Sequence, residues 1–382
     1  MTLRCTVGLW LLGVSVSAGG LRGGEAPAAS VAPAGRVVVE AIDAPSLAGN
    51  RLGDPARRDV AVYLPPSYDR SPSRRWPVVY FLGGFGDEIG FYLSGRYQGF
   101  ALPRSADDAL ARAGRELILV VVSGSNRFRG SFYVNSPVAG NWEDHVVREI
   151  VGHIDAHYRT LAVARARGIA GHSMGGFGAL NLAMRHPDVF GACDAMSPGL
   201  VAPEAFGETP MIGGGATAAA FVQTVEALRA QPAARTGYLA LGETLPAAGD
   251  WAELIAHAYA AAFAGGPGAS APYADYPYRR EDGGLVFDPA CWARWERGFG
   301  GWAEKIAARR AALAGLRGLA IEYGLDDENA WIPRGCAAVA ADLRAAGIAH
   351  TLTAFAGRHE DRLGERLTGH MLPFFAAVLA DE

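Results

Sequence analysis

A serine between glycines lies near the middle of the chain, in the run Gly171-His172-Ser173-Met174-Gly175. This is a G-x-S-x-G pattern, in which small residues two positions before and after the serine allow a sharp turn from a strand into a helix. The turn raises the serine hydroxyl above the sheet, where a general base can reach it. The pattern therefore predicts that Ser173 is a nucleophile.

The sequence on both sides of the motif favours this turn. Residues 167–170 form a short, mostly small and apolar run, as expected for a buried parallel strand. Residues 178–186 have helical character and end before Pro187. Gly175 and Gly176 would each destabilise an isolated helix by about 1 kcal/mol relative to Ala. Their presence indicates that the start of this helix packs very close to the sheet.

A serine hydroxyl needs a general base, and the base needs an orienting carboxylate. In folds with this turn the chain order is nucleophile, acid and histidine, so the candidates must follow Ser173. The later histidines are His186, His257, His350, His359 and His370. Only His359 lies in a loop between the last expected strand, 351–355, and the last expected helix, 362–379. His359 is therefore predicted to be the base, and His370 a surface or packing residue.

The acid is expected in the loop after a strand at residues 319–323. This loop contains three neighbouring carboxylates, Asp326, Asp327 and Glu328. One of them should accept a hydrogen bond from the His359 ring. Position in the loop favours Asp327 over Asp326, with Glu328 third.

The oxyanion of an acyl-transfer intermediate needs two backbone N–H donors. One is expected from Met174, the residue after the nucleophile, and the other from the glycine-rich loop Gly83-Gly84-Phe85. Phe85 is the preferred second donor, with Gly84 behind it. Each donor is worth roughly 3 kcal/mol in the transition state.

The chain is long enough for one large α/β domain, with residues left over for an insertion. The chain has 382 residues, of which 50% are hydrophobic, and a formal net charge of -4. This mild negative charge gives no reason to expect nucleic-acid binding.

The N-terminus has the pattern of an export signal. Arg4 precedes a mostly apolar run over residues 5–16, and Val16-Ser17-Ala18 offers a small-residue cleavage site. Residues 1–18 are therefore predicted to be a signal peptide, followed by a Gly/Ala/Pro-rich flexible leader at 19–35. The mature protein is expected to be secreted or periplasmic, with no stable membrane insertion, although an uncleaved N-terminal anchor is the alternative.

The cysteines are Cys5, Cys193, Cys291 and Cys336. Removal of the signal peptide would leave three, which allows one disulfide and one free thiol or free cysteines in the core. Their spacing does not match a zinc site, and no metal is expected.

Strand-like and helix-like stretches alternate along the chain, which predicts a mostly parallel central sheet with helices on both faces. Strands are expected at residues 37–39, 60–64, 77–82, 117–122, 167–170, 319–323 and 351–355. Between about residues 201 and 317 this alternation is lost. Helices are expected there at 217–229 and 251–263, and the insertion is predicted to be a lid over the active site.

Several motifs together resemble one known family. They are Leu64–Tyr68, Tyr80–Gly86, Asn141–Asp144, Gly171–Leu180 and His186–Phe190. They resemble the esterase D-like family of α/β-hydrolases, which includes S-formylglutathione hydrolases, feruloyl esterases, enterochelin esterases and the antigen 85 mycolyltransferases. The similarity covers about residues 60–199 and 319–375, which leaves the insertion unmatched. The resemblance implies an α/β-hydrolase domain over residues 36–382.

The resemblance also bears on the site. The family places its acid three residues after a glycine that ends the strand, so that Gly324 points to Asp327. It places the base in a Gly-x-His loop, which Gly357-Arg358-His359 matches. Many members have His-Gly where this chain has Gly83-Gly84, so the bracing of that loop is expected to differ.

The predicted function is that of a secreted serine carboxylic-ester hydrolase with an acyl-serine intermediate and no cofactor. The expected substrate is a small-molecule or polysaccharide-linked ester of a feruloyl, acetyl or other small acyl group. One alternative is an acyltransferase of the mycolyltransferase type, in which a sugar hydroxyl instead of water resolves the acyl-enzyme. Another is a non-catalytic binding module, against which the set of Ser173, Asp327 and His359 argues.

Overall fold

The computed structural model describes residues 34–211, 215–266 and 270–381. The predicted signal peptide and the predicted leader up to Pro33 lie outside this part of the chain, as does Cys5. Within it, no helix is both long enough and apolar enough to cross a membrane.

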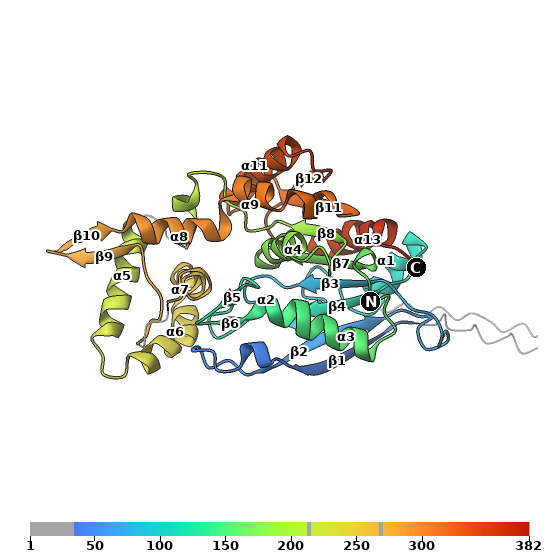
Figure 1. Cartoon of the computed structure of the whole chain (residues 1–382). Helices are drawn as coiled ribbons and strands as arrows, with labels where there is room; N and C mark the ends of the chain where they lie inside the picture. Colours follow the sequence, from blue (N-terminus) through green and yellow to red (C-terminus); the bar gives the residue numbers. More distant parts are fainter. Residues whose placement is uncertain (1–33, 212–214, 267–269, 382) are drawn as a thin grey trace, which may run out of the picture. The chain divides into compact units, whose positions relative to one another are not determined.

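The described fold is built around an eight-stranded sheet (Figure 1). Its strands lie in the order β1-β2-β4-β3-β7-β8-β11-β12. Their bounds are β1 (Arg36–Asp43), β2 (Arg57–Leu64), β3 (Val78–Leu82), β4 (Ile118–Val122), β7 (Arg167–His172), β8 (Ala192–Met196), β11 (Gly318–Gly324) and β12 (Thr351–Phe355). β2 is antiparallel to β1 and β4, and every other neighbouring pair is parallel. The predicted mostly parallel sheet is confirmed.

β8 is a strand of the sheet that the sequence analysis did not predict. Its five residues, Ala192–Met196, include two alanines and Asp194, which are depleted in strands. All five are nevertheless buried, because β8 lies between β7 and β11. Its strand conformation therefore follows from its place in the sheet and not from local propensity.

Helices cover both faces of the sheet. Along β3, Val78, Tyr80 and Leu82 pack into one hydrophobic cluster, whereas Val79 and Phe81 pack into another. Because neighbouring side chains on a strand point to opposite faces, the two clusters lie on opposite sides of the sheet. This confirms the predicted covering of both faces.

The first cluster is covered by the π-helical segment η3 (His145–Ile150), α3 (Val151–His157), α4 (Met174–Arg185) and α11 (Trp331–Ala345). α2 (Trp142–Asp144) lies directly before η3, and its Trp142 packs in a separate small cluster with Ala44 and Leu47. The second cluster is covered by α1 (Arg104–Ala113) and by the C-terminal helical run of α12 (Leu363–Arg366), η6 (Leu367–Met371) and α13 (Leu372–Val378). The π-helical segment η6 ends two residues before Pro373.

The insertion at 201–317 is mainly helical. It contains α5 (Gly215–Arg229), α6 (Ala234–Ala248), α7 (Trp251–Phe263), the hairpin β9 (Tyr278–Glu281) and β10 (Gly284–Phe287), and then α8 (Pro289–Phe299), α9 (Trp302–Ala308) and α10 (Arg310–Ala314). The two helices predicted there, α5 and α7, are present. The sequence analysis missed α6 and the hairpin. Shorter segments elsewhere are η1 (Pro45–Leu47), η2 (Ile89–Tyr92), β5 (Asn135–Ser136), β6 (Gly140–Asn141), η4 (Ala164–Ala166) and η5 (Phe206–Glu208).

Aromatic side chains join the insertion to the sheet domain. The ring of Phe132 lies 5.4 Å, centre to centre, from each of the rings of Tyr259, Phe263 and Phe299. Phe299 also lies 4.7 Å from Phe177 on α4. Such ring pairs add about 0.5–1.5 kcal/mol each to the burial of their area. The insertion is therefore packed against the helix that follows the serine.

The three described cysteines, Cys193, Cys291 and Cys336, are buried and free. No disulfide pairs them, so free core cysteines are the correct one of the two states considered. Burial raises the pKa of all three thiols, that of Cys291 to about 11, which keeps them protonated at neutral pH.

Candidate active site

Ser173 lies in a strained turn between β7 and α4. Its φ is 56° and its ψ is -115°, an uncommon conformation for a residue other than glycine. The turn is held by a hydrogen bond from the Ser173 N–H to the Met196 carbonyl of β8, at 2.9 Å. The predicted turn from strand to helix is therefore present, with the serine at its tip.

The glycines around the serine allow the close packing that the turn needs. A Cβ on Gly171 would lie 2.3 Å from the carbonyl oxygen of Gly175. A Cβ on Gly175 would lie 2.0 Å from the carbonyl oxygen of Leu82 on β3. Both contacts are with backbone atoms, which cannot rotate away. Any larger residue at these positions would push the helix off the sheet.

His359 lies in the loop after β12 and pairs with Asp327 from the loop after β11. The two atoms His359 Nδ1 and Asp327 Oδ2 are 2.7 Å apart, and both side chains are buried. An ionised carboxylate can only accept, so Nδ1 carries the proton and Nε2 is left free to act as a base. The geometry thus selects Asp327, whereas Asp326 is exposed to solvent.

The other carboxylates of the acid loop have different partners. Glu328 Oε2 accepts the main-chain N–H of His359 at 3.1 Å and lies 3.6 Å from Arg358. The second oxygen of Asp327 accepts the N–H of Asn329 at 2.8 Å, which fixes the carboxylate. Asp327 therefore orients the ring of His359, and Glu328 holds the backbone of His359.

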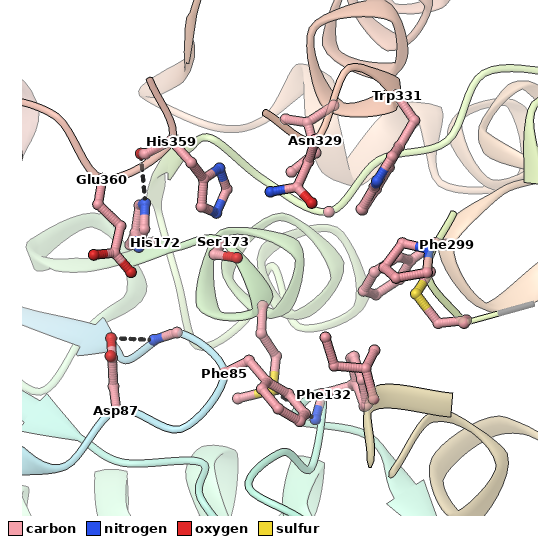
Figure 2. Close-up of a pocket in the computed structure, with 17 residues that line it drawn as sticks. Phe85, Asp87, Phe132, His172, Ser173, Phe299, Asn329, Trp331, His359 and Glu360 are labelled. Atoms are coloured by element: carbon pink, nitrogen blue, oxygen red, sulfur yellow. Dashed lines mark hydrogen bonds between the residues drawn. The ribbon is translucent and has the colours of Figure 1, made fainter. Parts of the chain in front are cut away.

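Ser173 and His359 line one pocket (Figure 2). The pocket has a volume of about 180 Å³. Its apolar lining comes from Phe85, Phe132, Met174, Pro210, Met211, Ile255, Phe299, Trp331 and Ile332. Its polar lining includes Asp87, His172, Asn329 and Glu360. In Figure 2, Phe299 and Trp331 lie on one side of the serine, and Asp87 and Glu360 on the other.

The insertion contributes directly to this pocket. Pro210, Met211, Ile255 and Phe299 all belong to residues 201–317 and line it. The sequence analysis did not predict these contacts by residue, because no local pattern links a helix in an insertion to a serine far away along the chain.

The two predicted oxyanion donors are available. Within the described residues, neither the Met174 N–H nor the Phe85 N–H has a hydrogen-bond acceptor. Gly84, the second choice, is engaged, because its N–H donates to Asp87 Oδ2 at 2.7 Å. Of the two candidates in this loop, Phe85 is therefore the one whose N–H has no acceptor among the described residues.

Asp87 supplies the bracing of the glycine-rich loop. Its carboxylate is buried and accepts the Tyr92 hydroxyl at 2.6 Å as well as the hydroxyl of Tyr97. Burial raises the pKa of both tyrosines well above the ordinary value, so both hydroxyls keep the protons that they donate. The sequence analysis expected the bracing of this loop to differ from that in many family members, but it did not assign the bracing to Asp87. Two neighbouring acids, Asp87 and Glu88, follow the glycine-rich loop, and only the structure shows that Asp87 holds it.

The other histidines that follow Ser173 lie away from the pocket lining. His186 Nε2 contacts Glu143 Oε1 at 2.6 Å, and His350 Nδ1 contacts the Ile348 carbonyl at 2.9 Å. His257 is buried in the insertion, 3.6 Å from Glu253. His370 is exposed on η6, as predicted.

No group of three or more His, Cys, Asp or Glu side chains in the described ranges is arranged to hold a metal ion.

The sheet order, the serine turn after β7 and the acid and histidine loops after β11 and β12 define the class of this protein, an α/β-hydrolase. The chain belongs to the esterase family, because residues 51–373 match the family model described as "Putative esterase". This confirms the resemblance seen in the sequence.

Curated relatives include Esterase Rv1288 and Esterase MT1326 of Mycobacterium tuberculosis. Each is 34% identical to this chain over 142 residues, which is 36% of this chain and 28% of the relative. The match thus spans little more than a quarter of the length of these relatives.

Solved structures with the same fold include a ferulic acid esterase, with a TM-score of 0.57 at 19% identity. That comparison covers 91% of this chain and 99% of the other. An S-formylglutathione hydrolase from Agrobacterium tumefaciens has a TM-score of 0.54 at 18% identity, with 92% and 98% covered. At these identities the likeness shows the fold alone.

Proposed function

We propose that the protein is a serine carboxylic-ester hydrolase in which Ser173, His359 and Asp327 form the catalytic triad. The observation that carries the proposal is the 2.7 Å contact of His359 Nδ1 with Asp327 in the pocket that also contains the strained serine. Membership in the esterase family supports it.

The chemistry follows from the roles of these atoms. Ser173 Oγ attacks the ester carbonyl carbon while His359 Nε2 takes the hydroxyl proton. Asp327 stabilises the imidazolium that forms, and the N–H groups of Met174 and Phe85 bind the oxyanion. The proton then passes to the leaving alcohol. Water, deprotonated by His359, then attacks the acyl carbon. The bond from this carbon to Ser173 Oγ breaks, His359 returns the proton to Oγ, and the acid is released.

The pocket supports a small acyl group with an apolar or aromatic body. About 180 Å³ of space is bounded by aromatic rings from the core and the insertion, among them Phe132, Phe299 and Trp331. Apolar walls favour desolvation of an apolar acyl chain. Feruloyl and acetyl groups are the proposed candidates, carried on a small molecule or a polysaccharide.

The proposal also includes export of the protein and a lid formed by the insertion. Arg4, the mostly apolar run 5–16 and the small residues 16–18 support a signal peptide. The enzyme is therefore proposed to be secreted or periplasmic, with its hydrolase domain in residues 36–382. The pocket contacts of residues 210, 211, 255 and 299 support a lid role for the insertion.

Replacement of the nucleophile tests the proposal. Ser173→Ala should lower kcat for p-nitrophenyl acetate by about 10⁴- to 10⁶-fold, because it removes the attacking atom. The measurement is initial rates on a panel of acetyl, butyryl and feruloyl esters, together with labelling by a fluorophosphonate. Activity of the variant near that of the unaltered protein would refute the assignment.

A further inference from the structure

The main-chain carbonyl of His359 accepts hydrogen bonds from two side chains that lie outside the loop of Asp327. His172 Nε2 lies 3.1 Å from this oxygen, as Figure 2 shows, and Arg366 Nη1 lies 3.2 Å from it. A carbonyl oxygen can only accept, so the His172 ring carries its proton on Nε2.

His172 is the residue immediately before the nucleophile. It ends β7, its side chain is 3% exposed, and its ring centre is 4.8 Å from that of His359. Burial lowers the pKa of His172 well below its ordinary value, with further lowering by His359 and Arg366. His172 is thus a neutral donor that joins the turn carrying the nucleophile to the loop carrying the base.

Arg366 joins the same carbonyl to the sheet. Its side chain is 3% exposed and donates to Glu322 on β11 at 2.8 Å and to Ser197, just after β8, at 2.9 Å. Its guanidinium carbon lies 4.3 Å from the ring centre of Phe355 at the end of β12. Arg366 is therefore held on several sides by the ends of the strands.

The loop of the base depends on such side-chain contacts. Gly357, two residues before the histidine, has a φ of 149°, outside the region that other residues readily adopt. The N–H of His359 is held by Glu328 and its carbonyl by the two donors described above. Both main-chain polar groups of His359 are thus fixed by side chains of other segments.

We propose that His172 and Arg366 are positioning residues for the base: by holding the carbonyl of His359 they keep its imidazole within reach of Ser173. The proposal rests on the function proposed above. Misplacement of reacting groups by about 1 Å can cost on the order of 10²-fold in rate. Loss of either donor should therefore lower kcat more than it raises KM, because ground-state binding of the ester does not use these bonds.

A matched pair at His172 tests the proposal. The amide nitrogen of a glutamine can occupy the place of the histidine Nε2 and donate to the same carbonyl, whereas leucine fills similar space without a donor. His172→Leu should lower kcat about 10- to 100-fold with little change in KM. His172→Gln should recover most of that loss. Inactivation by a fluorophosphonate, which also needs the base, should slow in the same proportion.

Arg366→Lys provides a second variant. An ammonium group can retain the pair with Glu322 but cannot also reach Ser197 and the His359 carbonyl, so kcat measured well below the unfolding midpoint should fall. The thermal unfolding midpoint should also fall, because buried hydrogen bonds are lost, and it shows at which temperature the variant is still folded. If His172→Leu does not fold, Arg366→Lys is the variant that tests the proposal.

Two results would overturn the inference while leaving the proposed function intact. One is a folded His172→Leu or Arg366→Lys protein with unchanged kcat. The other is a His172→Gln protein as slow as His172→Leu. Failure of the proposed function would look different, since the unaltered protein itself would then neither hydrolyse esters nor react with the fluorophosphonate.

Discussion

At the scale of single residues, the site depends on which of three neighbouring carboxylates contacts the ring of His359. Asp326 and Asp327 are adjacent in the sequence, yet only Asp327 is buried and in contact with His359. Glu328 holds the backbone of the same histidine. Three acids in one loop therefore have three different surroundings, and only one of them can orient the ring.

A pair of conservative replacements tests this difference. Asp327→Asn should lower kcat about 10⁴-fold, because an amide at this position favours the wrong tautomer of His359. Asp326→Asn, the matched control, should leave kcat near its original value since its side chain is exposed. Steady-state rates on one ester suffice for the comparison. A larger loss in the Asp326 variant would reverse the assignment.

At the scale of elements, the turn between β7 and α4 depends on the absence of side chains. The helix begins so close to β3 that a Cβ on Gly175 would overlap the backbone of Leu82. This explains why glycines that weaken an isolated helix occur at the start of a helix that is buried along most of its length.

Alanine substitutions at two glycines should have opposite effects on stability. Gly175→Ala should lower the free energy of unfolding by at least about 2 kcal/mol, because the methyl group meets fixed backbone. Gly152→Ala, in α3, meets nothing within 4 Å and should raise it by roughly 0.5–1 kcal/mol. Urea unfolding measures both. Equal effects of the two changes on the free energy of unfolding would contradict the close approach of α4 to β3.

At the scale of the whole molecule, the sheet contains a buried acid that the proposed reaction does not use. Asp194 on β8 is 3% exposed, and burial raises its pKa well above the ordinary value. The negative charge of Glu322 raises this pKa further, and Arg366 opposes the rise. Asp194 is therefore protonated in the folded protein at pH values where the unfolded chain, with a pKa of about 3.9, has lost the proton.

This difference predicts a pH dependence of stability. A carboxyl whose pKa is raised on folding stabilises the fold fully below the pKa of the unfolded chain, and this contribution is lost as pH rises towards the folded pKa. Asp194→Asn cannot ionise, so its stability relative to the original protein should increase from about pH 4 upwards. Unfolding curves at several pH values measure this, with Asp326→Asn as the exposed control. Parallel curves for Asp194→Asn and the original protein would contradict the prediction.

Much of the fold and of the candidate site could be predicted from short-range patterns in the sequence. The serine turn, the helix after it and the loop of His359 follow from residues within a few positions of one another, because turn chemistry and strand or helix periodicity are local. The apolar runs at 77–82 and 117–122 predicted the strands β3 and β4 for the same reason.

The tertiary structure decided what depends on contacts between distant segments. It placed β8 between two parallel strands, paired Asp327 with the ring of His359, committed Gly84 to Asp87, and brought the insertion to the pocket wall. The bond from His172 to the His359 carbonyl joins residues 187 positions apart. No spacing in the sequence encodes such a contact, because it exists only once the sheet has brought the ends of its strands together.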